Sequence, residues 1–126
     1  MEKRLLVSVV DDDESVRESL PDLLWEMGFE PCAFASAEEF LESGSVEKTK
    51  CLILDIKMPG MSGPELASTL RARGIFIPVI FITANDRNIY RMDVVAEHAV
   101  ACLYKPFSDE DLYNALLEAG KRGEGN

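Results

Sequence analysis

The sequence predicts an α/β fold in which helices cover both faces of a five-stranded parallel sheet. Short apolar runs rich in branched residues recur along the chain, which is typical of strands buried on both faces of such a sheet. Segments with helical spacing of apolar residues separate these runs, and this alternation indicates repeated βα units. Because βα crossovers are right-handed, we expect a doubly wound sheet in the order 2-1-3-4-5, with five helices and a site at the carboxyl ends of strands 1 and 3.

The first βα unit occupies the first 28 residues of the chain. Leu5–Val10 is an apolar run and is the first expected strand. After Asp13, apolar residues recur at a spacing close to 3.6 until Gly28, which suits the position just beyond a helix end. The first helix is therefore expected between these two residues.

The second unit has a weaker strand signal and a clear helix start. Glu30–Ala35 is the strand candidate, and a proline near its start weakens the signal. Ser36 and Glu39 have the spacing of a capping box, which predicts the start of the second helix. The third strand is then expected at Cys51–Leu54, a continuous apolar run.

The third helix and the fourth strand follow from similar signals. Ser62 and Glu65 form a second capping-box pattern, and Gly74 marks the end of the helix. Val79–Ile82 is an apolar run that predicts the fourth strand. Residues 86–96 have a less regular helical pattern, and we expect the fourth helix there.

The last unit completes one domain. Val100–Tyr104 is the fifth expected strand, and Ser108 with Asp111 predicts the start of the fifth helix. We expect residues 1–120 to form this single domain and the polar, glycine-rich residues 121–126 to form a frayed tail.

The bulk composition limits the classes of partner. The chain has 126 residues and a net charge of −10, which argues against direct contact with nucleic acid or an anionic membrane. The three cysteines, Cys32, Cys51 and Cys102, are expected to be reduced core thiols. Because the first ten residues lack a signal-peptide pattern and the apolar runs are short, we expect a cytoplasmic protein.

The predicted topology brings charged and polar residues from four strands to one edge of the sheet. Asp11 and Asp12 follow the first strand, Asp55 the third, Thr83 the fourth and Lys105 the fifth. Three carboxylates close together need a cation, and hard oxygen ligands favour Mg²⁺ or Mn²⁺. A carboxylate can also attack phosphorus, and a lysine and a hydroxyl can bind phosphate oxygens. These residue types therefore point to phosphoryl transfer onto a carboxylate.

Four segments in order strengthen this interpretation: "VVDDDESVRESL", "CLILDIKMPGMSGPEL", "PVIFITA" and "YKPF". Together they resemble the response-regulator receiver domains of two-component signalling, which have a flavodoxin-like fold. The resemblance implies that Asp55 is the phosphoacceptor. It also implies that Asp11, Asp12 and Asp55 bind Mg²⁺ together with the backbone carbonyl of Lys57.

The resemblance assigns the conformational switch to the last two strand ends. It implies that Thr83 is the switch hydroxyl and that Lys105 pairs with the phosphate, with a cis peptide bond before the following proline. Receivers usually carry an aromatic residue three positions before this lysine, where the present sequence has Cys102. Tyr104 could supply a substitute surface, because alternation along a strand places it on the same side as Cys102.

The same resemblance implies the partners. A histidine kinase or a phosphotransfer protein would donate the phosphoryl group. The output would be a protein-interaction surface formed by helix 4, strand 5 and helix 5, read by a downstream protein or by an output domain outside this chain. It also allows a homodimer that forms on phosphorylation. Apart from its own phosphorylation and dephosphorylation, no enzymatic activity is expected.

Two other functions are compatible with parts of the sequence. A haloacid-dehalogenase-like phosphohydrolase also uses an aspartate nucleophile, but it usually has an acid two residues further on, where this chain has Lys57. A receiver-fold interaction module that works without phosphorylation is favoured only by Cys102. Under each of these functions, only the first two acids of "DDDE" belong to the site. Asp13 and Glu14 are expected to stabilise the start of the first helix.

Overall fold

The predicted parallel sheet is present, and its strands have the order β2-β1-β3-β4-β5. The computed structural model describes residues 3–84 and 99–124. All four strand pairings are parallel. The strands are β1 (Leu6–Val10), β2 (Glu30–Phe34), β3 (Cys51–Asp55), β4 (Val79–Ala84) and β5 (Ala99–Lys105).

Four α-helices and one short 3-10 helix connect the strands within the described residues. The fourth predicted helix, at residues 86–96, lies outside the described part of the chain. The 3-10 helix was not predicted, because a three-residue turn has no periodicity for a sequence pattern to detect. The helices are α1 (Glu14–Glu26), α2 (Ala37–Glu42), η1 (Val46–Lys48), α3 (Gly63–Ala72) and α5 (Asp109–Glu124).

The helix starts agree with the capping patterns of the sequence. Ser62 and Glu65 form the complete capping box of α3, in which each side chain accepts a hydrogen bond from the other residue's backbone N–H. Ser36 accepts from the N–H of Glu39 at the start of α2. α5 continues to Glu124, four residues into the tail that we expected to be frayed. Buried apolar side chains on its inner face stabilise the helix despite the glycines near its end.

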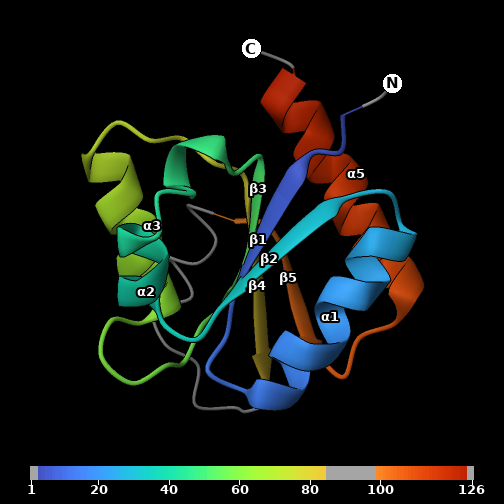
Figure 1. Ribbon diagram of the computed structural model, residues 1–126, viewed down its shortest axis with the longest axis horizontal. Coiled ribbons are helices and arrows are strands. Elements are labelled where there is room, and N and C mark those ends of the chain that lie inside the picture. The colour runs from blue at the N-terminus through green and yellow to red at the C-terminus, as the bar shows by residue number, and fades with distance from the viewer. Residues whose placement is uncertain (1–2, 85–98, 125–126) are drawn as a thin grey trace.

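The sheet separates two apolar cores. One lies between the sheet and α2 and α3, and includes Phe40, Leu66 and Phe81. The other lies between the sheet and α1 and α5, and includes Leu24 and Leu112. Figure 1 shows the two helix pairs on opposite sides of the sheet. Because β1 and β3 are covered on both faces, their residues are almost all buried, which explains their uninterrupted apolar sequences.

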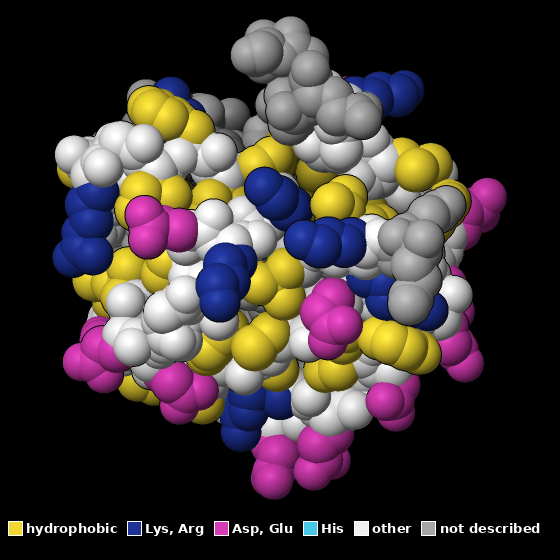
Figure 2. Space-filling model, turned by 45° about the horizontal axis from the view of Figure 1, so that its top comes forward, with side chains coloured by type: hydrophobic (Ala, Val, Ile, Leu, Met, Phe, Trp, Pro, Cys, Tyr) yellow, Lys and Arg dark blue, Asp and Glu magenta, His cyan; other side chains and the backbone are white. Residues whose placement is uncertain are grey.

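Charge is distributed unevenly between the two ends of the sheet. Exposed basic side chains lie next to the amino ends of the strands: Lys3 and Arg4 precede β1, Lys50 precedes β3, and Arg71 and Arg73 lie at the end of α3. Figure 2 views this end of the molecule and shows Lys and Arg side chains across the middle of the face. The carboxyl ends of the strands, at the bottom of Figure 1, carry the acids described below. The three acids of the candidate site therefore lie at the opposite end of the sheet from these basic side chains.

Candidate functional site

Strand register brings the predicted residues to one edge of the sheet. Asp11 directly follows β1, Asp55 is the last residue of β3, and Lys105 is the last residue of β5. Asp55 pairs with Ile82 of β4, so that Thr83 is the next residue along the neighbouring strand. The four strand ends therefore meet where a doubly wound sheet places its ligand site.

The three predicted acids form one cluster. Asp11, Asp12 and Asp55 each contribute a carboxylate oxygen, and these oxygens lie within 4.8 Å of one another. The side chains of Asp11 and Asp55 are buried, whereas Asp12 is exposed to solvent. Buried like charges repel strongly, so this arrangement favours a bound cation. A donor set made only of carboxylate oxygens fits a hard divalent ion such as Mg²⁺ or Mn²⁺.

Asp11 is held by hydrogen bonds on every side. Its Oδ2 accepts from Lys105 Nζ at 2.8 Å, and its Oδ1 accepts from the backbone N–H of Asp13 at 2.9 Å. Its own N–H donates to Phe34 O at 3.1 Å, and its carbonyl accepts from Arg17 Nη1 at 3.0 Å. These contacts fix both the backbone and the carboxylate of Asp11 before any ligand binds. Sequence reasoning did not identify Arg17, because nothing in the pattern of α1 shows that its guanidinium turns back to β1.

Lys105 is the cation nearest the cluster among the described residues. Its ammonium lies 2.8 Å from Asp11 Oδ2 and 3.7 Å from Asp55 Oδ1. Burial and the negative charge of Asp11, opposed by Lys105, raise the pKa of Asp55 to about 7. Burial disfavours the charged form of Lys105, but its hydrogen bond to Asp11 and the charge of Asp55 raise its pKa overall. The ionisation of the Asp55 carboxylate therefore depends on the charges around it.

The four acids after β1 fall into two groups, as predicted from the sequence. Asp13 is the N-cap residue of α1, and its Oδ1 accepts from both N–H and Oγ of Ser15, at 2.9 and 2.7 Å. These hydrogen bonds lower the pKa of Asp13. Glu14 lies in the first turn of α1, where a negative charge is favourable. The two acids therefore stabilise the helix start, and Asp11 and Asp12 are left for the cluster.

The loop between β3 and α3 begins at the cluster. Its two ends are joined by a hydrogen bond from Gly63 N to Ile56 O at 2.9 Å. A Cβ atom added to Gly63 would lie 2.2 Å from the carbonyl oxygen of Asp55, so the backbone of α3 packs directly against that of β3. Lys57 is the second residue of the loop and its side chain is exposed. The role of its carbonyl as a metal ligand stays a prediction.

Cys102 and Tyr104 of β5 differ in how far they are exposed to solvent. Cys102 is half-buried and packs against the core under α2 and α3. Tyr104 is 44% exposed and is the register partner of Thr83 on the neighbouring strand. The peptide bond between Lys105 and Pro106 is cis, as the resemblance implied. The aromatic residue closest in register to the predicted switch hydroxyl is therefore Tyr104.

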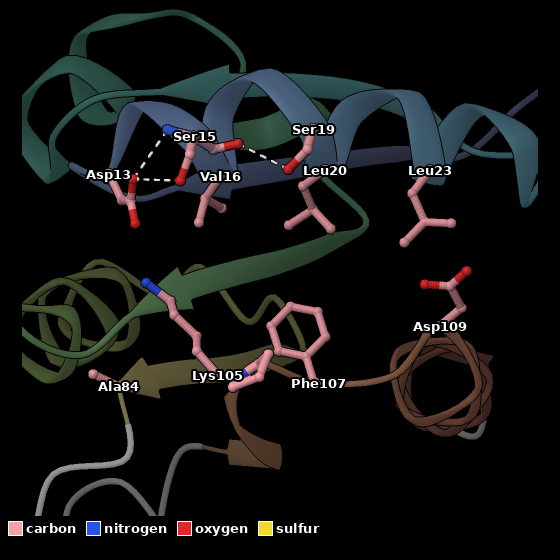
Figure 3. Close-up of a pocket in the computed structure, with 11 residues that line it drawn as sticks. Asp13, Ser15, Val16, Ser19, Leu20, Leu23, Ala84, Lys105, Phe107 and Asp109 are labelled. Carbon is pink, nitrogen blue, oxygen red and sulfur yellow. Dashed lines mark hydrogen bonds between the residues drawn. The ribbon is translucent and has the colours of Figure 1, made fainter.

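A groove opens beside the cluster, between α1 and the segment that follows β5. Its volume is about 580 Å³. Figure 3 shows Val16, Leu20 and Leu23 projecting from α1 toward Phe107 across the groove. Lys105 also lines this groove, and so connects it directly to the acid cluster.

Within residues 3–84 and 99–124, none of the helices combines the length and the apolar character needed to cross a bilayer.

Comparison with known proteins identifies the family to which this site belongs. Residues 7–117 match the family model of the response regulator receiver domain. The chain belongs to this family. It is the receiver domain of a two-component response regulator, and the five-stranded sheet in the order 2-1-3-4-5 is the receiver fold.

Individual relatives agree with this identification. The receiver is 40% identical over 119 residues to nodulation protein W of Bradyrhizobium diazoefficiens, covering 94% of this chain and 52% of that protein. It is 37% identical to the transcriptional regulatory protein FixJ of Azorhizobium caulinodans, covering 92% of this chain and 55% of that protein. The crystal structure of FixJ-N superimposes with a TM-score of 0.82 at 34% identity, covering 96% of both chains. This receiver spans about half the length of the curated relatives it matches.

Proposed function

We propose that Asp55 accepts a phosphoryl group from a histidine kinase or a phosphotransfer protein, in a reaction that requires Mg²⁺ or Mn²⁺. The observation that carries this proposal is the cluster itself: three carboxylate oxygens within 4.8 Å, at the end of β3, with the ammonium of Lys105 3.7 Å from Asp55 Oδ1. Asp11, Asp12, Asp55 and the carbonyl of Lys57 would hold the cation. When bound, it neutralises charge on the phosphoryl oxygens.

The chain's own groups account for the remaining chemistry. An ionised Oδ of Asp55 attacks the phosphorus of phosphohistidine, a P–O bond forms, and the P–N bond breaks. The imidazole keeps the electron pair of that bond and takes up a proton. Lys105 pairs with an oxygen of the new acyl phosphate, and the hydroxyl of Thr83 donates a hydrogen bond to another. Apart from hydrolysis of this acyl phosphate, the receiver catalyses no turnover.

Phosphorylation then changes a surface for protein partners. The phosphoryl group adds negative charge and three acceptor oxygens at the carboxyl edge. Thr83 is the second-last residue of β4, and Tyr104 is beside it on β5. A hydrogen bond from Thr83 to the phosphoryl group would draw Thr83 toward Asp55. This movement would shift β5 and the exposed aromatic ring of Tyr104. A downstream protein, an output domain in a longer protein or a second phosphorylated receiver would bind at the altered surface of β5 and α5; the fourth helix that the sequence adds to this surface lies outside the described residues.

The groove between α1 and the β5–α5 loop is the proposed contact surface for the phosphodonor protein. A donor histidine must reach Asp55 across the carboxyl edge, and this groove adjoins that edge through Lys105. Apolar side chains of α1 line it, and the hydroxyls of Ser15 and Ser19 also border it. An amphipathic helix of the donor fits such a groove, because its apolar face replaces water there.

Phosphorylation by a small molecule tests the proposal directly. The receiver is incubated with Mg²⁺ and acetyl phosphate, and its intact mass is measured. We expect a gain of one phosphoryl group in the wild type and none in Asp55→Asn or in the presence of a chelator. No gain in the wild type, or an equal gain in Asp55→Asn, would overturn the proposal. Equal affinity for a partner with and without beryllofluoride would instead support an interaction module that works without phosphorylation.

A further inference from the structure

The loop after the phosphoacceptor is fixed at its ends but has few contacts at its crest. Ile56 and Met58 are buried, and the bond from Gly63 N to Ile56 O closes the base of the loop. Lys57, Pro59 and Gly60 are exposed. The crest, residues 59–61, therefore depends on contacts with another element for a defined conformation, and the carbonyl of Lys57 lies between the base and this crest.

One side chain of α2 supplies such a contact. Glu38 Oε2 accepts a hydrogen bond from the backbone N–H of Met61 at 3.1 Å, across 23 residues of sequence. Among the bonds made by the residues that the structure describes, it is the one that joins the crest to a different element. A hydrogen bond to a charged acceptor is stronger than one between neutral groups. Glu38 thus ties the loop to the first turn of α2.

The residue next to Met61 shows how closely the loop packs on this carboxylate. Gly60 has a φ of 74°, which L-residues rarely adopt. A Cβ atom added there would lie 2.9 Å from Glu38 Oε2. The backbone of Gly60 and the N–H of Met61 together form the surface on which the Glu38 carboxylate rests.

We infer that Glu38 is a positioning residue for the phosphorylation site, which holds the β3–α3 loop so that the carbonyl of Lys57 faces the acid cluster. This inference rests on the proposed function, because it concerns the metal site of that function. Groups that orient metal ligands without touching the metal typically affect metal affinity by 10- to 100-fold. Because Glu38 is exposed and acts through a loop, we expect a smaller effect, roughly three- to tenfold.

The same helix offers matched controls. Glu39, the next residue, accepts from Ala35 N at 3.1 Å and its own N–H donates to Ser36, so it serves only the start of α2. Glu42 is also exposed on α2. Replacing Glu42 with Gln removes the same charge as replacing Glu38, without touching the loop. Replacing Glu39 with Ala weakens the cap of α2 and leaves the bond to Met61 in place.

The experiment measures Mn²⁺ binding from the loss of the free-ion signal in electron paramagnetic resonance, together with hydrogen exchange of the Met61 amide. We expect Glu38→Ala to weaken Mn²⁺ binding about three- to tenfold and to accelerate exchange at Met61. Glu38→Gln, which keeps an acceptor oxygen, should restore most of both. Glu42→Gln and Glu39→Ala should bind Mn²⁺ as the wild type does.

The possible results separate this inference from the proposed function. Wild-type affinity in Glu38→Ala, with Mn²⁺ still bound by the wild type and lost in Asp12→Asn, would overturn the inference and leave the proposed function intact. Equal losses in Glu38→Ala, Glu38→Gln and Glu42→Gln would show an effect of charge alone and would also overturn it. If the wild type neither binds Mn²⁺ nor accepts a phosphoryl group, the proposed function fails and the inference fails with it.

Discussion

Lys105 Nζ donates its hydrogen bond to Asp11 Oδ2 at 2.8 Å, whereas Asp55 Oδ1 lies 3.7 Å away. The lysine that we assign to the phosphate is therefore bonded to a carboxylate that we assign to the metal. An ammonium and a divalent cation cannot both occupy the same side of Asp11 without repelling each other. We therefore expect Lys105 to move away from Asp11 as the cation binds, and in the proposed function this movement would bring it toward an oxygen of the phosphoryl group on Asp55.

Removing the Lys105 charge should therefore strengthen metal binding. We expect Lys105→Met to bind Mn²⁺ about tenfold more tightly than the wild type, because one competing positive charge is lost. Titration calorimetry would measure the affinity. Lys50→Met is the control, since its exposed side chain carries the same charge but lies at the amino end of β3, away from the cluster. An equal gain in both variants would show that overall charge, and not competition at Asp11, is responsible.

Neutralising single acids should separate the cluster from the helix start. Asp12→Asn should weaken Mg²⁺ binding by tenfold or more, roughly the loss of one charged ligand. Glu14→Gln should leave the affinity nearly unchanged, because Glu14 lies in the first turn of α1 and outside the cluster. Mn²⁺ titrations of both variants provide the comparison. Similar losses would mean that the acids after β1 act as one group.

The Asp55 pKa of about 7 predicts how stability depends on pH. The folded receiver holds a proton on Asp55 at pH values where the unfolded chain, with a pKa near 3.8, has lost it. Folding therefore takes up a proton in this range, and stability falls as the pH rises from 4 to 7. Asp55→Asn cannot ionise, so it should be more stable than the wild type at pH 7 by roughly 4 kcal/mol, about 1.4 kcal/mol for each unit of the difference in pKa, and the gap should shrink toward pH 4.

Urea unfolding with a chelator present would measure this difference. Adding Mg²⁺ should then stabilise the wild type more than Asp55→Asn, because the cation binds the ionised carboxylate. A difference between the two proteins that is the same at pH 4 and pH 7 would contradict the raised pKa.

Gly63 should tolerate no side chain. In Gly63→Ala the new Cβ would lie 2.2 Å from the carbonyl oxygen of Asp55, so either α3 or the end of β3 must shift. We expect a loss of about 3 kcal/mol or more in the free energy of unfolding. Gly120→Ala is the matched control, because a Cβ there meets nothing within 4 Å and alanine favours the interior of α5. Chemical denaturation of both variants should give changes of opposite sign.

A charge in the groove should distinguish protein donors from small ones. Ser19 is exposed on α1 and lines the groove. Ser19→Glu should slow phosphorylation by a histidine kinase that phosphorylates the wild type, roughly tenfold or more, because a negative charge disfavours an apolar contact. Phosphorylation by acetyl phosphate should be unaffected. If both rates fall together, the groove does not contact the donor.

Strand positions and strand order could be predicted from sequence because each strand is a short apolar run between turn signals. The predicted run Cys51–Leu54 differs from β3 only by Asp55, whose charge ended the apolar pattern although its carboxylate is buried. The cap of α1 at Asp13 and the capping box of α3 were also predictable, since capping depends on residues only two or three positions apart.

The contacts that shape the site were less predictable. Arg17 reaches back to Asp11, and Glu38 reaches the loop at Met61. Both are exposed or half-buried charged residues on helices, and in folded proteins most such residues face water. Their roles depend on the distance between two elements after folding, which local spacing does not encode. Sequence reasoning named the side chains to which we assign chemistry, and it missed two that hold the backbone around them.

The close approach of Gly63 to Asp55 also determines where the receiver can yield. On that side of Asp55, the backbone of Gly63 lies directly against the backbone of β3, so a shift there would need main chain to move. On the other side lie β4 and β5, which carry the hydroxyl of Thr83 and the long side chain of Lys105 near their ends. A change at Asp55 is therefore harder to accommodate by moving the start of α3 than by moving the side chains at the ends of β4 and β5. In the proposed function, the strain that phosphorylation introduces would therefore be released toward β4 and β5.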